Sequence, residues 1–395
     1  MNKLLLTALG LISISTFAQA VENTPTVTIG GFIDTQAGFR SQKSSYDINA
    51  SDQKLNNKAI VNDTKIDVKV ENKAANGLKY GGYIRLNADT SIDAAGDDDF
   101  IADRTLLFAE TAYGRLEAGA YDSASRQMMT SAQNIAVGAF GINGYMPKWA
   151  GINGTEFIKW PELMTNCDCI SFGNKVTYLT PKYKGFNAGV SYTPDIGVQG
   201  TVSKLNATSK NEDMNFRQIV DWGLNYENKF NEVNYKLGFI GQTGKAKSLT
   251  VQRKDLRSWE LGAIVSYKGF SIAGSYSDWG KSGTPVVRAA GKKYGAKFWT
   301  AGAAYEQNQF RTSLTYMKGY RANAFSKDVP ATTADHVPGY NKTEYISLGA
   351  DYKMAPGFRP YVEINHFETK RSASDSKGRL GNKGEVYLLG TRISF

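Results

Sequence analysis

The feature that most constrains this chain is a repeated alternation of apolar and polar residues. Runs of about ten residues, in which every second side chain is apolar, recur from residue 26 to the last residue. Successive side chains of a β-strand point to opposite faces, so each run predicts a strand with one apolar and one polar face. About ten residues is also the length of a tilted strand that crosses a bilayer. Short turns alternate with long polar connections, which is typical of an outer-membrane barrel.

The first three runs, residues 26–40, 60–71 and 78–89, illustrate the two faces. The predicted outward side chains are Val27, Ile29, Ile33, Ala37, Phe39, Ile66, Val68, Val70, Tyr80, Ile84, Leu86 and Ala88. The predicted inward side chains are Thr28, Asp34, Gln36, Arg40, Lys65, Asp67, Lys69, Lys79, Tyr83, Arg85 and Asn87, with Phe32 as an apolar exception among them. The alternation therefore predicts that Arg40, Lys69 and Arg85 face the interior of a barrel.

Twelve further runs are followed by a terminal one. They lie at residues 101–111, 115–121, 175–183, 186–193, 218–230, 232–243, 258–268, 270–277, 298–306, 310–320, 345–354 and 358–367. The total is about sixteen strands, and bacterial barrels of this kind have an even number. The predicted fold is all-β: a transmembrane antiparallel β-barrel wide enough for a water-filled channel. A soluble sandwich or propeller also alternates, but neither explains the run length or the short and long connections.

The last run, residues 383–395, ends the chain on Phe395. Tyr387, Leu389, Ile393 and Phe395 share one face with Thr391, and Arg392 lies on the other. A strand that ends the chain must pair at both edges or remain exposed at one of them. We expect it to pair with the first strand and close the barrel.

Residues 1–20 have the pattern of a cleaved signal peptide. Lys3 is the basic start, residues 4–14 are mostly apolar, and Ala18-Gln19-Ala20 is a small-x-small cleavage site. Residues 21–395 are then one barrel domain. The 40 glycines, 22 tyrosines and 19 phenylalanines suit turns and interfacial aromatic girdles. A mean hydropathy of −0.38 fits as well, because only every second residue faces lipid.

The net charge of +10 favours anionic surfaces or anionic solutes. Nucleic acid is not expected as a partner, since the chain is exported and has no basic helix. An enzyme is not expected either, because His336 and His366 are the only histidines and neither has a G-x-S-x-G partner. No cofactor is indicated. Cys167 and Cys169 form a C-x-C pair that suits a strained disulfide better than zinc, and whether they are bonded stays open.

Residues 122–173 form the longest stretch without alternation. They include Trp149, Trp160 and four methionines. A connection this long and this apolar is expected to be packed or functional rather than disordered.

Three features together resemble the sixteen-stranded, trimeric general porins of Gram-negative bacteria. They are the opening Val27-Thr-Ile-Gly-Gly-Phe-Ile-Asp34, the long loop after the fifth strand, and the closing Tyr387–Phe395. The resemblance implies a homotrimer in the outer membrane, in contact with lipid and lipopolysaccharide. It also implies that the barrel-assembly machinery reads Tyr387, Leu389, Ile393 and Phe395 as an assembly signal.

The same resemblance implies that the loop of residues 122–173, the third loop, folds inward and makes a constriction opposite wall arginines. Arg104 matches the arginine of the family's fourth strand, although Leu106 and Phe108 share its parity and leave its direction ambiguous. The predicted constriction residues are Arg40, Lys69, Arg85, Arg104, Glu156 and Glu162. The loop departs from enterobacterial relatives in its greater length and in lacking their P-E-F-G-G run.

The function expected from this pattern is passive diffusion of small hydrophilic solutes and ions, with a mild preference for anions. A substrate-specific channel and a plugged surface or adhesin barrel are the alternatives. Saturable block by one solute would favour the first, and the absence of conductance would favour the second.

Overall fold

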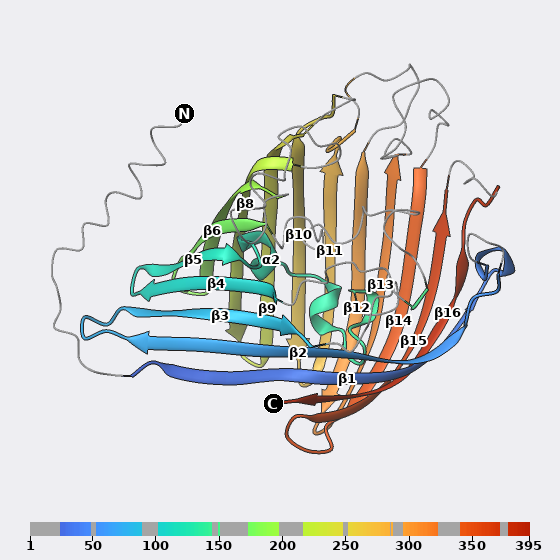
Figure 1. The fold of residues 1–395 in the computed structure, drawn as a ribbon, viewed down its shortest axis with the longest axis horizontal. Coiled ribbons are helices and arrows are strands. Elements are labelled where there is room, and N and C mark those ends of the chain that lie inside the picture. Colours follow the sequence, from blue (N-terminus) through green and yellow to red (C-terminus); the bar gives the residue numbers. More distant parts are fainter. Residues whose placement is uncertain are drawn as a thin grey trace.

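The computed structural model describes residues 24–48, 53–88, 102–143, 149–150, 173–196, 216–247, 252–284, 286, 295–322, 340–371 and 378–395. Sixteen strands form one closed antiparallel barrel in which each strand pairs with its neighbours in the chain (Figure 1). The strands are β1 (Thr26–Gln42), β2 (Lys58–Lys73), β3 (Lys79–Asn87), β4 (Ala102–Thr111), β5 (Gly114–Ala120), β6 (Asn174–Leu179), β7 (Phe186–Asp195), β8 (Phe216–Phe230), β9 (Val233–Ala246), β10 (Leu256–Tyr267), β11 (Phe270–Gly280), β12 (Ala296–Gln307), β13 (Phe310–Ala322), β14 (Tyr340–Tyr352), β15 (Phe358–Lys370) and β16 (Lys383–Ser394). The predicted fold class is confirmed.

The barrel closes between the first and the last strand, as the terminal pattern predicts. Phe39 lies opposite Tyr387 and Ala37 opposite Leu389 in the β1–β16 ladder. Beyond the ladder, the Gly31 N–H donates to the Phe395 carbonyl over 3.1 Å, and the Phe395 N–H donates back to Gly31 over 3.2 Å. Pairing with both β1 and β15 satisfies the backbone of β16 and leaves no free sheet edge.

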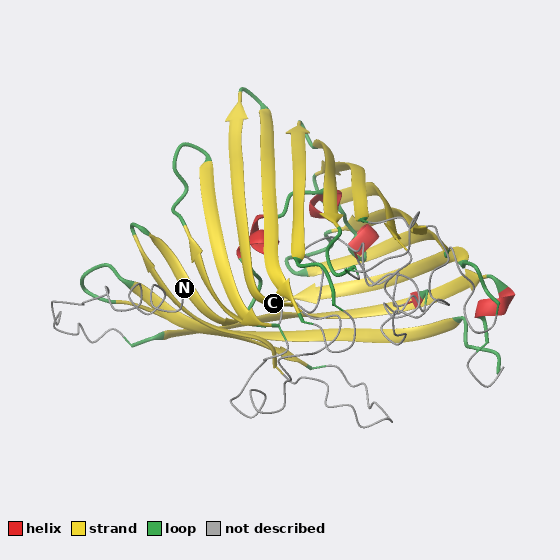
Figure 2. Cartoon of the chain, turned by 90° about the horizontal axis from the view of Figure 1, so that it is seen from above, coloured by secondary structure: helices red, strands yellow, loops and turns green. Residues whose placement is uncertain are grey.

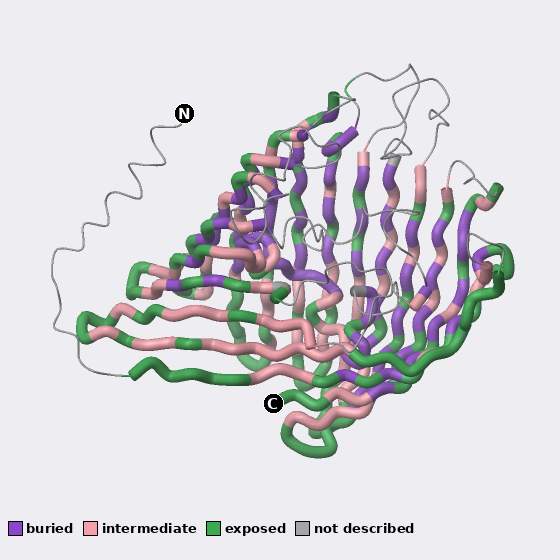
Figure 3. Tube along the Cα trace, viewed as in Figure 1, coloured by how far each residue is buried: buried purple, intermediate pink, exposed green. Residues whose placement is uncertain are grey.

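Exposed and buried residues alternate along most strands, although not along β2 and β3 (Figure 3). The exposed positions of the alternating strands are mostly apolar, and many of the buried ones are polar. Ile33 and Phe39 are exposed on the outer face, whereas Asp34 and Gln36 are buried on the inner one. An apolar outer face is what a lipid environment requires. Among the described residues, no helix is long and apolar enough to cross a membrane.

Strand β4 is the place where alternation alone is ambiguous. Leu107 is 69% exposed, whereas Leu106 is 6% and Phe108 5% exposed, so the even positions of this strand face inward. A side chain at Gly81 would lie 2.9 Å from the Phe108 ring, so the glycine leaves room for that ring on the inner wall. Arg104 therefore faces inward, as the resemblance implies.

Tight turns connect the strands at one end of the barrel. Asn231-Glu232, Lys268-Gly269 and Asn308-Gln309 each join two strands, and their first residues have φ values of 53°, 45° and 55°. A positive φ at this position gives a hairpin turn whose twist matches that of the strands. The strand ends that the longer connections join lie at the opposite end, in agreement with the predicted asymmetry.

Several predicted strand bounds are corrected. The run expected at residues 175–183 ends at Leu179, because Pro181 lacks the N–H that the ladder needs. Most other strands continue beyond their apolar runs: β14 begins at Tyr340 instead of residue 345, and β15 continues to Lys370 instead of residue 367. Polar residues form these additional ladder pairs, beyond the outward-facing apolar side chains from which the runs were predicted. The predicted signal peptide, residues 1–20, lies outside the described residues.

In the part of the chain that the structure describes, the helical segments with defined bounds are short. The 3-10 helix η1 (Ser44–Tyr46) follows β1, and three more segments follow β5: α2 (Ala124–Met128), η2 (Ala132–Ile135) and η3 (Gly141–Asn143). In both views the stretch after β5 lies inside the ring of strands (Figures 1 and 2). This is the first part of the predicted inward-folded third loop.

Candidate pore lining

The third loop is attached to the inner wall by hydrogen bonds from its backbone. The Ala124 N–H donates to Ser191 Oγ on β7 over 2.7 Å. Further along, the Ala132 N–H donates to Thr300 Oγ1 on β12 over 3.2 Å. The Val137 N–H donates to Ser313 Oγ on β13 over 2.9 Å. Small hydroxyl side chains of the wall thus satisfy N–H groups at the starts of α2 and η2, and one between η2 and η3, that would otherwise lack a backbone partner.

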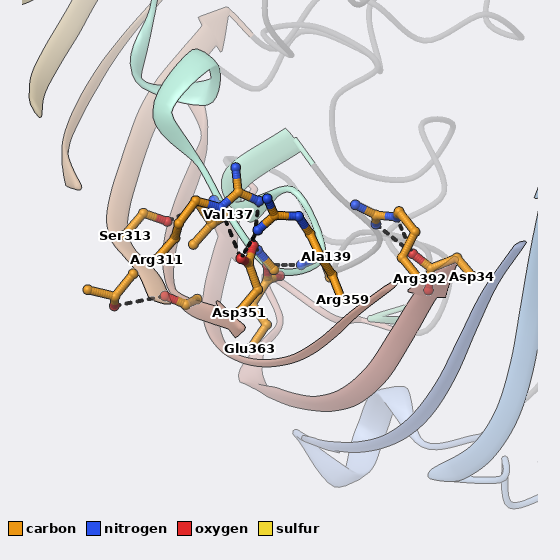
Figure 4. Close-up of polar contacts among 12 residues, drawn as sticks. Asp34, Val137, Ala139, Arg311, Ser313, Asp351, Arg359, Glu363 and Arg392 are labelled. Carbon is orange, nitrogen blue, oxygen red and sulfur yellow. Dashed lines mark hydrogen bonds and ion pairs between the residues drawn. The ribbon is translucent and has the colours of Figure 1, made fainter. Parts of the chain in front are cut away.

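Buried carboxylates of the inner wall also bind the third loop. Glu363 Oε2 on β15 accepts hydrogen bonds from the Ala139 N–H over 2.8 Å and from the Gly141 N–H over 3.0 Å (Figure 4). Asp221 on β8 accepts one from the Ser125 hydroxyl over 2.7 Å. Burying a carboxylate is costly unless hydrogen bonds compensate, and the loop supplies them. These acids therefore hold the loop and are not displayed to the lumen.

A row of inner-wall glycines makes room for the loop. We call them the wall glycines: Gly38, Gly189, Gly223, Gly238, Gly262, Gly302 and Gly349. A Cβ at Gly223 would lie 2.8 Å from Met128 Sδ, and one at Gly349 would lie 2.5 Å from the Val137 carbonyl oxygen. At Gly262 a Cβ would overlap the Thr130 carbonyl. Because these distances are shorter than real Cβ contacts, the loop can lie this close only against a wall without side chains at these points.

Three arginines form a cluster on β13, β15 and β16 (Figure 4). Arg311 Nη2 lies 2.7 Å from Asp351 Oδ2, and Arg359 Nη1 lies 2.9 Å from Asp351 Oδ1. Arg392 Nε donates to Asp34 Oδ2 over 2.8 Å. The guanidinium of Arg392 also lies 4.0 Å from the centre of the Phe140 ring of the loop. One buried carboxylate thus serves two arginines, and the loop covers the third with an aromatic face.

The two members of each ion pair differ in exposure. The side chains of Arg311 and Arg359 are each 31% exposed, against 4% for Asp351. Arg392 is 17% exposed and its partner Asp34 is fully buried. The cationic ends of these pairs therefore reach the lumen, while the anionic ends are covered by the wall and the loop.

A second charged group lies on β2, β3 and β4. Arg85 Nε donates to Asp67 Oδ1 over 2.7 Å, and the Tyr83 hydroxyl donates to the same oxygen over 2.6 Å. Arg104 lies directly opposite Arg85 in the β3–β4 ladder, and its Nη1 is 2.9 Å from Asp122 Oδ2 at the root of the loop. The alternation and the resemblance thus identify two neighbouring inward arginines.

The other predicted constriction residues lie apart from these two. Arg40 donates to the carbonyl oxygens of Trp149 and Asn56 and so joins two loops to β1. Lys69 pairs with Glu71 over 2.6 Å on β2. Glu156 and Glu162 lie outside the described residues, as do Cys167 and Cys169. Among the described residues, no group of histidine, cysteine and acidic side chains could hold a metal ion.

The sequence reasoning did not single out Arg311, Arg359 or Arg392 as site residues. Each of them shares its parity with the polar side of its strand, so the alternation contained the signal. The buried acids Glu363 and Asp221 gave no such signal, because their role depends on where the loop passes.

Comparisons with known proteins agree with this geometry. A family model described as "Gram-negative porin" matches residues 6–372. A protein of Rickettsia bellii is 27% identical, and one of Rickettsia felis is 26% identical, each over 100% of both chains; both are called uncharacterized.

Solved barrels share the fold at low sequence identity. An anion-selective porin from Comamonas acidovorans is 14% identical, covers 94% of this chain and 100% of its own, and has a TM-score of 0.60. The trimer form of OmpT, an outer-membrane protein of Vibrio cholerae, is 12% identical over 94% of this chain and 100% of its own, with a TM-score of 0.60. A mutant porin of Rh. blastica is 13% identical with the same coverage and a TM-score of 0.55. With the family match over most of its length, the chain belongs to the Gram-negative porin family and is an outer-membrane channel protein.

Proposed function

We propose that the chain forms a water-filled pore through which small hydrophilic solutes and ions cross the outer membrane by passive diffusion. Sixteen strands enclose a lumen wide enough for water. The inner wall carries charged and hydroxyl side chains that keep such a lumen hydrated. Diffusion through it requires no cofactor and no chemical step, so we expect no enzymatic activity.

The pore prefers anions mildly in this proposal. The observation that carries it is the unequal exposure of the ion pairs: Arg311 and Arg359 are each 31% exposed while their common partner Asp351 is 4% exposed. Fixed charges that line a narrow aqueous path select the sign of the ions that pass. A net positive lumen surface would thus concentrate anions. The net charge of +10 points the same way.

We assign the constriction to the third loop, residues 122–173, and the wall that faces it. In this proposal the predicted wall arginines Arg85 and Arg104 line it on one side, and we add Arg311, Arg359 and Arg392 on the other. Glu156 and Glu162 remain predicted members on the loop. The hydrogen bonds of Arg40 to two loops suit a residue that fixes their position.

We further propose a homotrimer. The apolar outer faces of β1 and β16 offer a surface for a second copy, with Ile29, Leu389 and Ile393 exposed there. The Vibrio cholerae barrel with the same fold is described in a trimer form. The closing strand, with Tyr387, Leu389, Ile393 and Phe395 on its outer face, remains the predicted signal for the barrel-assembly machinery.

Liposome swelling tests the proposed function. Liposomes that contain the folded protein should swell in isotonic solutions of small neutral solutes, and the rate should fall steeply as solute size increases. Liposomes that contain heat-denatured protein are the control. Equal rates with folded and denatured protein would contradict the proposal and favour a plugged barrel.

A further inference from the structure

A pocket lies on the inner side of β1 and β2, beside Trp149 of the third loop. It has a volume of about 370 Å³, within the range of small-molecule sites, which runs from about 300 to 1,000 Å³. Its lining residues are Gln36, Arg40, Asn56, Asn57, Lys58, Ala59, Val61, Asn62, Asp63 and Trp149. Four of these ten residues carry a side-chain amide, and one is an aromatic residue.

Trp149 is fixed in place against the wall. Its indole Nε1–H donates to Gln36 Oε1 over 3.0 Å, and its carbonyl oxygen accepts a hydrogen bond from Arg40 over 3.2 Å. A Cβ on Gly38 would lie 2.5 Å from the indole ring, so only glycine lets the ring pack this closely. An aromatic ring that is already held rigidly loses little entropy when a solute packs on it.

The lining has three charged residues, Arg40, Lys58 and Asp63, and two of them, Arg40 and Asp63, already have partners. Arg40 donates to the Asn56 carbonyl oxygen over 3.1 Å and lies 3.7 Å from Asp47. Asp63 lies 2.9 Å from Lys65. These contacts leave the four side-chain amides, together with the single ammonium of Lys58, as the hydrogen-bonding groups of the lining. An amide both donates and accepts, which matches a hydroxyl group better than it matches an ion.

One amide is incompletely satisfied. Gln36 is 1% exposed, and its Nε2 has no hydrogen-bond partner among the described residues. An unpaired buried donor costs about 1–3 kcal/mol, so an enclosed water that accepted a hydrogen bond from it would stabilise the lining.

We propose that this pocket is a binding subsite for small, neutral, polyhydroxylated solutes of the size of a mono- or disaccharide. The sugar ring would pack on Trp149, and its hydroxyl groups would bond to the amides. The inference rests on the proposed diffusion function, because the subsite lies on the inner wall of the pore. Binding would be weak, with a Kd on the order of millimolar, since a solute must also leave the pore.

The test is saturable block of single-channel current by sucrose in a planar bilayer. Sucrose should reduce the current of the native protein with a half-maximal concentration in the millimolar range. Gluconate, a polyhydroxylated anion, distinguishes recognition of hydroxyl groups from recognition of charge. If the subsite recognises hydroxyl groups, sucrose should block the current at least as well as gluconate does. A current that falls only in proportion to solution viscosity, without saturation, would overturn the inference.

Two variants place the block in the pocket. Trp149→Ala should raise the half-maximal sucrose concentration about tenfold or more. The double variant Asn56→Ala, Asn57→Ala should raise it as well, and it leaves intact the backbone carbonyls that hold Arg40 and β1. Trp259→Ala is the matched control, because Trp259 is an exposed tryptophan on the outer face of β10, outside the pocket. An equal loss of block in Trp259→Ala would place binding elsewhere and contradict the subsite.

Calorimetry separates this inference from the proposed function. If the native protein conducts no current, the diffusion proposal fails, and titration of sucrose into the purified, folded protein still decides the subsite. Heat of binding that disappears in Trp149→Ala supports it, and the absence of binding heat in the native protein overturns it.

Discussion

Replacing the wall glycine Gly349 by alanine tests how tightly the third loop is packed on the barrel. Gly349 lies on the inner face of β14, and a Cβ there would be 2.5 Å from the Val137 carbonyl oxygen and 3.2 Å from its carbonyl carbon. Ordinary contacts of a Cβ begin at 3.4 Å, so the shortfall is about 0.9 Å. Both atoms belong to the loop backbone and cannot rotate away, so the segment itself has to move.

The segment that has to move carries three hydrogen bonds to the wall. They run from the Val137 N–H to Ser313 over 2.9 Å and from the Ala139 and Gly141 N–H groups to Glu363 over 2.8 and 3.0 Å. A displacement of about 0.9 Å would lengthen them toward or beyond the roughly 3.5 Å limit of a hydrogen bond. Overpacking of this kind costs about 1–3 kcal/mol. Because the wall lies behind the loop, the loop can move only toward the lumen.

We therefore expect Gly349→Ala to lower the thermal unfolding temperature and to reduce the single-channel conductance. Thermal unfolding of the purified protein and recordings in a planar bilayer measure the two effects. Gly82→Ala is the matched control, because a Cβ at Gly82 on β3 would make only ordinary contacts of 3.4 and 3.5 Å. If Gly349→Ala matches the native protein in both measurements, the loop does not pack on β14 as described.

Two further variants test the lumen charges and the closure of the barrel. Arg359→Gln removes a lumen cation but leaves Asp351 bonded to Arg311, so the barrel should fold and its reversal potential in a salt gradient should shift toward cations. Lys182→Gln, at an exposed surface pair, should leave that potential unchanged, and an unchanged potential in Arg359→Gln would remove this arginine from the selectivity argument. Deletion of Phe395 removes its two backbone hydrogen bonds to Gly31 and should lower the yield of folded barrel. Phe395→Tyr keeps both bonds and should assemble normally; equal yields from the deletion and the native chain would refute a role for this residue.

Strand positions and faces could be predicted from the sequence because a period of two survives in nearly every strand. In β1, the inward Asp34 and Gln36 and the outward Ile33 and Phe39 are placed correctly by counting alone. The faces of strand β4 could not be predicted by this count, because Leu106 and Phe108 are apolar but face inward. Their burial depends on a neighbour across the ladder, Gly81, and on the β3–β4 register, which alternation within one strand does not contain.

The candidate site was only partly predictable for the same reason. Arg85 was expected inside from its own strand, and Arg104 from the resemblance. The loop has no periodicity, so the residues beneath it could not be recognised before its path was known. Glu363 looks like an ordinary inward carboxylate until the N–H groups of Ala139 and Gly141 are placed against it. Gly349 and Gly262 likewise read as ordinary strand glycines until the loop backbone lies beside them.

The most direct test of the account is the current through single channels of the native protein in a planar bilayer with a salt gradient. The account predicts discrete, nearly ohmic steps and a reversal potential whose sign shows that anions cross more readily than cations. Steps with the opposite sign would contradict the positive lumen surface. The absence of any current from a folded barrel would contradict the open channel itself.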